Sequence, residues 1–309
     1  MLSKYRSFIV RCLWILLIGM LSTSCGTRGI TPTPALPSRI PSTKPPATQT
    51  PTTFIPSPTP VKLAAKVNGE EITLAEFEDE VARFQASQGG NPEETVADAR
   101  QKVLDNLVDL LLLAQGAREA GFKVDENLLG TRWDGLVSDI GGEEALNDWI
   151  ANQGYTKESF KQSLGLSIEA AWMRDEIAST IPATAKQVHA RQILLYNSEE
   201  AQNVLTQLKD GKDFATLASA YDPSGLGDLG WFPQGYLSEP LVEQAAFSLQ
   251  LGEYSDVIET QLGFHIIQVI EIDPERPLDP GARLILQEKA LSDWLDRQHS
   301  QAKIEVMLP

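Results

Sequence analysis

The chain has 309 residues, of which 42% are apolar and 22% are charged. These values are ordinary for a globular protein and exclude a wholly disordered, collagen-like or multi-span membrane protein. Its 26 Lys and Arg residues face 42 Asp and Glu residues, for a formal net charge of −16. An acidic protein is repelled by phosphate backbones, so nucleic acid is not an expected partner.

Residues 1–24 are typical of a signal peptide. Basic residues precede the apolar run CLWILLIGML (12–21), which is too short to span a bilayer but suits a signal peptide. Small residues and Cys25 follow, which resembles the lipobox of bacterial lipoproteins, although Ser22 replaces its usual leucine. The resemblance implies lipidation of Cys25. Alternatively, a secretory signal is cut elsewhere and Cys25 remains a free thiol. Both readings place the protein outside the cytoplasm.

The segment 25–62 is expected to be a linker that begins with the lipidated cysteine. Residues 27–62 contain ten of the 19 prolines and nine threonines, without apolar periodicity. Such a segment buries too little apolar surface to offset its ordering entropy. As a polyproline-II-rich spacer it reaches at most about 110 Å. We therefore expect a membrane lipoprotein whose only membrane contact is the lipid anchor.

Residues 63–185 are predicted to form a helical domain. Val67–Ile72 reads as a short strand and turn, and Thr73 with Glu76 has the spacing of a capping box. Asn91-Pro92 is predicted to begin a second helix, which ends near Ala120. This helix is apolar nearly all round and is expected to be central and buried. Three more helices are predicted at about 126–138, 143–152 and 157–179.

Residues 186–273 are predicted to form one small α/β domain. A strand over Val188–Tyr196 opens it, and a glycine-rich loop is expected over 222–230. Helices are predicted from Ser198 to about Lys209, from Asp213, and over about 240–249. Strands at about 256–260 and 264–272 close the domain.

Residues 274–309 contain one more predicted helix, at about 281–298. Its apolar face is formed by Leu284, Leu291, Trp294 and Leu295. A lone amphipathic helix gains its stability mainly from packing, so we expect it to return to the helices of 63–185. The alternating tail Ile304, Val306 and Leu308 is expected to pair with the strand near Val67. The fold class is therefore α+β, with an inserted α/β domain in a discontinuous helical domain.

No metal or cofactor is expected. The motif GLGDLG (225–230) fits GxGxxG, but a helix and a turn precede it and Trp-Phe-Pro follows, which is the wrong context for a dinucleotide site. A mature chain that has lost Cys12 keeps one cysteine and three histidines, and lipidation of that cysteine leaves too few ligands for a zinc site built from four Cys and His side chains. No nucleophile elbow is present, which argues against a hydrolase.

Several segments resemble the parvulin family of peptidyl-prolyl cis/trans isomerases. They are VHARQILL (188–195), YDPSGLGDLGWFPQG (221–235), EQAAFSLQLGEYSDVI (243–258) and TQLGFHIIQV (260–269). The flanks, with VNGEEIT followed by a helix, are similar to the extracytoplasmic foldases of the PrsA and SurA type. The resemblance implies a SurA-N-like chaperone domain and a parvulin domain. It also implies activity on X-Pro bonds of unfolded or secreted polypeptides.

The same resemblance supplies the candidate site residues. The expected catalytic residues are Asp222, His265, Gln192 and Thr260, and the expected proline-pocket residues are Leu229, Phe232, Leu237 and Leu241.

The chain departs from the family at the site. Gln192 stands where the family usually has histidine, and Leu241 where it has phenylalanine. His189 does not replace the missing histidine, because strand alternation points it to the opposite face. As alternatives to a role in the site, His265 is a buried core histidine and Asp222 only forms a turn. The alternative function is a catalytically weak or inactive holdase chaperone.

Overall fold

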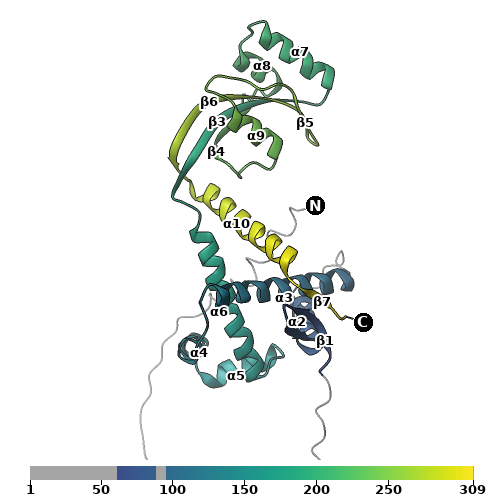
Figure 1. The fold of residues 1–309 in the computed structure, drawn as a ribbon, viewed down its shortest axis with the longest axis vertical. Helices are drawn as coiled ribbons and strands as arrows, with labels where there is room; N and C mark the ends of the chain where they lie inside the picture. The colour runs from purple at the N-terminus through teal and green to yellow at the C-terminus, as the bar shows by residue number, and fades with distance from the viewer. Residues whose placement is uncertain (1–60, 88–94, 309) are drawn as a thin grey trace, which may run out of the picture. The chain divides into compact units, whose positions relative to one another are not determined.

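The computed structural model describes residues 61–87 and 95–308 (Figure 1). The predicted signal peptide, Cys25 and all but the last two residues of the linker lie outside the described residues. So does the helix start that the sequence predicts at Asn91.

The described part begins with a β-hairpin. Strands β1 (Leu63–Val67) and β2 (Glu70–Thr73) pair antiparallel, so the short strand and turn predicted over Val67–Ile72 belong to a hairpin whose first strand was not predicted. Asn68 and Gly69 form the turn with φ of 51° and 93°. Asn-Gly tolerates positive φ at both positions, which two-residue hairpin turns of this kind require. The Thr73–Glu76 capping box is confirmed by hydrogen bonds in both directions, and α2 (Leu74–Ser87) follows it.

Helix α3 (Val96–Glu119) is the centre of the helical part. It begins at Val96, with a capping box between Thr95 and Asp98. Its buried residues include Leu111, Leu112 and Leu113, which confirms the expected buried helix. It contacts α2, β1 and two later helices. The remaining helices of this segment are α4 (Glu126–Ile140), α5 (Glu143–Asn152) and α6 (Lys157–Ser179).

The C-terminal segment returns to the helical part, as expected. Helix α10 (Pro280–Gln301) packs on α6 and α3 (Figure 1). Leu291, Trp294 and Leu295 join a cluster with Leu113 and Ile177. Strand β7 (Ile304–Val306) then pairs antiparallel with β1, which confirms the predicted pairing of the tail.

One detail of this return differs from expectation. Leu284 is 55% exposed, so it was wrongly placed on the packed face of α10. The packed face continues at Trp294, whose indole lies so close to α3 that a Cβ on Gly116 would stand 2.6 Å from it. Glycine at this position therefore permits the two helices to approach.

The inserted segment forms an antiparallel sheet with the strand order β4-β3-β6-β5. Its long central pair is β3 (Thr184–Leu195) and β6 (Gly263–Pro277), and β5 (Ile258–Thr260) is an edge strand. Strand β4 (Asp228–Pro233) was missed, because its glycine-rich start was read as loop. Helices α7 (Ser198–Lys209) and α8 (Phe214–Tyr221) cover one face, and α9 (Pro240–Ser248) covers the other.

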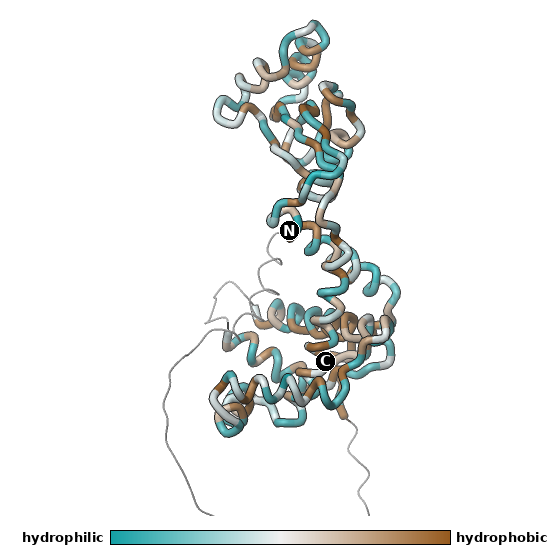
Figure 2. The backbone as a smooth tube through the Cα atoms, turned by 90° about the vertical axis from the view of Figure 1, so that its left-hand side faces the viewer, coloured by the Kyte–Doolittle hydropathy of each residue, from teal (hydrophilic) through white to brown (hydrophobic). Residues whose placement is uncertain are grey.

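Hydrophobic and hydrophilic residues are mixed along the helices (Figure 2). Within residues 61–87 and 95–308, no helix is long and apolar enough to cross a membrane.

Candidate active site

A row of three polar side chains crosses the sheet of the inserted segment. His265 on β6 is buried, with 2% of its surface exposed. Its Nδ1 lies 2.9 Å from Oε1 of Gln192 on β3, and its Nε2 lies 2.9 Å from Oγ1 of Thr260 on β5. The strand order places β6 between β3 and β5, so neighbouring strands bring the three residues together. Three of the four expected catalytic residues therefore form one hydrogen-bonded unit.

The partners of His265 determine its proton position. An amide oxygen only accepts, so His265 Nδ1–H donates to Gln192. The other ring nitrogen then accepts from the hydroxyl of Thr260, whose oxygen in turn accepts the N–H of Leu262. Burial lowers the pKa of His265, while the carboxylate of Glu239 opposes this shift. His265 is therefore neutral at pH 7 and has both nitrogens satisfied.

Asp222 organises the loop beside this row. Its two carboxylate oxygens accept the backbone N–H groups of Gly225 and Gly227 at 2.9 and 3.2 Å. These hydrogen bonds lower the pKa of Asp222, so it is ionised at neutral pH. The carbonyl of Gly227 accepts the backbone N–H of Gln192 at 2.8 Å. Asp222 thus acts on the row through the loop, and its catalytic role remains a prediction.

The predicted proline-pocket residues separate into two groups. Leu229 and Leu237 pack, partly buried, against the cluster that contains Phe232. Phe232 has no exposed surface, so it supports this cluster from inside the core. Leu241, in contrast, is 54% exposed at the start of α9.

Leu241 lies in an open hollow of about 620 Å³ next to the polar row. The hollow is lined by Glu239, Pro240, Leu241, Glu259, Thr260 and Gln261. Thr260 therefore belongs both to the hydrogen-bonded row and to the hollow. Substrate in this hollow would meet the exposed leucine and the hydroxyl that His265 holds.

The sequence reasoning missed Glu243, which shapes the same region. Its carboxylate accepts the backbone N–H groups of Gly235, Tyr236 and Leu237 at 2.8, 2.9 and 3.0 Å. These bonds fix the loop that carries Leu237 before α9. The sequence did contain a signal for Glu243, because Pro240 is typical of a helix start and carboxylates favour the first turn of helices.

Comparison with known proteins identifies the family. A family model described as a PPIC-type PPIase domain matches residues 178–273, and a SurA-like N-terminal domain matches residues 55–132. The foldase protein PrsA of Halalkalibacterium halodurans is 30% identical over 268 residues, covering 78% of this chain and 72% of that relative. This chain belongs to the PrsA foldase family. The inserted segment is therefore a parvulin-type peptidyl-prolyl cis/trans isomerase domain, beside a SurA-N-like helical domain.

Two other PrsA proteins are also similar to this chain. The PrsA of a Geobacillus species is 29% identical over 227 residues, covering 70% of this chain and 79% of that relative. The crystal structure of PrsA from Bacillus cereus has a TM-score of 0.45 and 19% identity, and the match covers 77% of this chain and 89% of that one.

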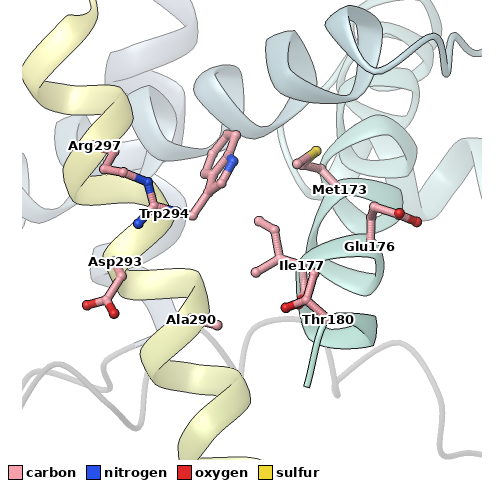
Figure 3. A pocket seen from close by; sticks show the side chains of 8 residues that line it. All are labelled: Met173, Glu176, Ile177, Thr180, Ala290, Asp293, Trp294 and Arg297. Atoms are coloured by element: carbon pink, nitrogen blue, oxygen red, sulfur yellow. The ribbon is translucent and has the colours of Figure 1, made fainter. Parts of the chain in front are cut away.

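The helical part of this PrsA-family chain has a hollow of its own, of about 350 Å³ between α6 and α10 (Figure 3). Met173, Ile177 and Trp294 line its apolar side. Figure 3 shows Trp294 directed from α10 toward Met173 and Ile177 on α6. The other lining residues are Glu176, Thr180, Ala290, Asp293 and Arg297. Of the apolar residues that line this hollow, only Trp294 was considered from the sequence, which placed it on the packed face of the last helix.

No metal centre is apparent in the described part of the chain, where no three His, Cys, Asp or Glu side chains are grouped to hold an ion.

Proposed function

We propose that this protein isomerises X-Pro bonds of unfolded polypeptides outside the cytoplasm, tethered to the membrane by a lipid on Cys25. The observation that carries the catalytic part is the row Gln192–His265–Thr260, which opens through Thr260 into the hollow at Leu241. The tether rests on the signal-like first residues and on Cys25.

The chemistry needs no covalent step. Rotation about the prolyl bond has a barrier of about 20 kcal/mol, set by amide resonance. A catalyst lowers it by binding the twisted, less conjugated amide better than the planar one. Leu241 offers an apolar surface for the proline ring. Polar groups fixed before the substrate arrives stabilise the changed charge distribution of the twisted amide.

Each member of the row then has a distinct task. Neutral His265 is a positioning residue, because its two nitrogens hold Gln192 and Thr260. Gln192 uses its oxygen for His265, which leaves its NH₂ group to donate to the substrate amide. Thr260 lines the hollow and contacts the substrate. Glutamine is thus a workable replacement for the histidine usual in parvulins.

A holding role in the helical domain is the second proposed function. The α6–α10 hollow is lined by partly buried methionine and tryptophan side chains, with the buried Ile177 beneath them. Methionine-containing surfaces adapt to varied partners. We therefore assign to this hollow the binding of apolar side chains from unfolded clients. A chain that holds clients without isomerising them is the alternative to the full proposal.

The two roles are separable by experiment. Magnetisation-exchange NMR on an unstructured X-Pro peptide measures isomerisation directly, and delayed aggregation of an unfolded client measures holding. His265→Ala is expected to abolish the acceleration and leave holding intact. Trp294→Ala is expected to weaken holding and leave the acceleration intact. Exchange no faster than in the free peptide, from a folded protein, would overturn the isomerase assignment.

A further inference from the structure

Glu239 is a carboxylate without a local structural task. It occupies the position before the first residue of α9, yet its side chain makes no capping hydrogen bond. Glutamate is also not among the residues preferred there. Within residues 61–87 and 95–308, no hydrogen bond or ion pair is found for its carboxylate. Glu243, four residues later, accepts three backbone N–H groups, so the two neighbouring glutamates differ sharply.

Glu239 faces the candidate site. It lines the hollow together with Leu241 and Thr260. Its charge also raises the pKa of His265 against the larger, lowering effect of burial, which shows that its field reaches the polar row. Because Glu239 is half-buried, its carboxylate attracts a cation more strongly than a carboxylate surrounded by water does.

The hollow as a whole is negative. Its six lining residues include two carboxylates, Glu239 and Glu259, and no cation. Glu259 is exposed and alternates with Thr260 along β5, so it points away from the polar row. Glu239 is therefore the carboxylate best placed to meet a substrate side chain next to the proline.

We propose that Glu239 makes the isomerase selective for X-Pro bonds that have a lysine or arginine next to the proline. The proline ring lies on Leu241 and the bond faces Thr260, so the neighbouring side chain reaches Glu239 at the edge of the same hollow. An acidic neighbour is repelled. This inference rests on the proposed isomerase function and names its preferred substrates.

The test uses the full chain in detergent and a panel of unstructured peptides. The residue before or after the proline is lysine, glutamine or glutamate, and exchange NMR gives kcat/KM. We expect lysine to exceed glutamate by about tenfold at low salt, with glutamine between them. Because the Debye length falls from about 30 Å at 0.01 M to about 3 Å at 1 M salt, the ratio should shrink as salt is added.

Glu239→Gln is expected to reduce the lysine-to-glutamate ratio to about two, and Glu259→Gln to change it less. The charge-matched control is Glu275→Gln. Glu275 lies ten residues from His265 along β6, which corresponds to about 33 Å in an extended strand. This substitution should leave the lysine-to-glutamate ratio unchanged. A ratio near one in the unaltered protein, or one that Glu239→Gln does not change, overturns the inference.

The failure of this inference differs from the failure of the proposed function. Equal acceleration of all peptides preserves the isomerase and removes the selectivity. If no peptide is accelerated, the isomerase proposal fails. Chemical-shift titration of the lysine and glutamate peptides then still decides whether Glu239 selects cationic ligands, because it measures binding without turnover.

Discussion

At the residue scale, the site depends on a buried histidine kept neutral by its surroundings. His265 donates to Gln192 and accepts from Thr260, so each nitrogen has one partner. Protonation would place the second hydrogen of the ring on Nε2, which could then no longer accept from the threonine hydroxyl. The hydrogen bond from the Thr260 hydroxyl to Nε2 is therefore formed only while His265 is neutral.

This gives a pH dependence with a definite sign. Burial lowers the pKa of His265 below its usual 6.5, so we expect isomerase activity to be constant above pH 7 and to fall in acid. The midpoint of the acid limb should lie below 6.5. The unfolded chain binds the proton more readily, so the contribution of His265 to stability is full above pH 6.5 and lost as pH falls through the lowered pKa.

Activity and the NMR titration of the His265 ring, measured across pH 4–8, check this expectation. Glu239→Gln removes the carboxylate that raises the pKa of His265, so the acid limb should move to lower pH in that variant. An acid limb centred above 6.5 would contradict a buried, neutral histidine.

At the element scale, the loop from Asp222 to β4 depends on glycine at one position. Gly227 has φ of +69°, and a Cβ there would overlap the backbone oxygen of Gln192. The loop thus sits directly against the strand that carries the candidate site. The glycine-rich stretch that first suggested a nucleotide motif has this packing task instead.

Gly227→Ala is expected to reduce both stability and isomerase activity, because it combines the strained φ with a backbone clash. Gly230→Ala is the matched control, since Gly230 has φ of +67° but nothing within 4 Å of a Cβ. Strain alone should cost about 1 kcal/mol, and the clash should add to it. Urea unfolding of both variants measures the difference. Equal losses would contradict the close approach to Gln192.

The contact of α10 with α3 has a similar dependence on glycine. Gly116→Ala would place a Cβ 2.6 Å from the Trp294 indole, so we expect a loss of about 1–3 kcal/mol from overpacking. Gly130→Ala is the control inside α4, where nothing lies within 4 Å, and it should stabilise by up to about 1 kcal/mol. Thermal unfolding that ranks the two variants in the reverse order would contradict the packing.

The sequence predicted elements better than it predicted contacts. The bounds of α5 and α6 followed from caps and periodicity, because these signals are local. Strand β4 was missed because its glycines resemble a loop, and Leu284 was misplaced because periodicity does not tell where a packed face ends. The family resemblance brought Gln192, His265 and Thr260 into consideration together.

The resemblance did not indicate Glu239 or Glu243. Their different roles arise because loop backbone N–H groups turn toward Glu243 and not toward Glu239, and a place in the first turn of a helix does not by itself specify that.

At the scale of the whole molecule, the helical part is built from two distant stretches of chain. The inserted segment 184–277 departs from the helical part and returns to it at one place. There Thr184 pairs with Pro277, and the N–H of Leu278 donates to the carbonyl of Ala183 at 3.0 Å. The ends of the inserted segment are therefore adjacent. We therefore expect the helical part to need α10 and β7, which pack on it, but not the intervening sheet.

Replacement of residues 184–277 by a short Gly-Ser linker is therefore expected to leave a folded, cooperative helical protein that still delays client aggregation. Truncation after residue 183 is the comparison, because it removes α10 and β7 and uncovers Leu113 and Ile177. That truncated chain should aggregate or lose cooperative unfolding. A linker variant without cooperative unfolding would show that the helical part depends on the inserted domain.

The most direct measurement of the central claim is prolyl exchange with Thr260 varied. In Thr260→Val the hydroxyl is gone and Nε2 of buried His265 is left without its donor, which costs about 1–3 kcal/mol. Thr260→Ser keeps the hydroxyl. Magnetisation-exchange NMR should show acceleration by the unaltered chain, a loss of about tenfold or more in the valine variant, and retention of most activity in the serine variant. Equal activity in all three folded proteins would contradict a catalytic row of Gln192, His265 and Thr260.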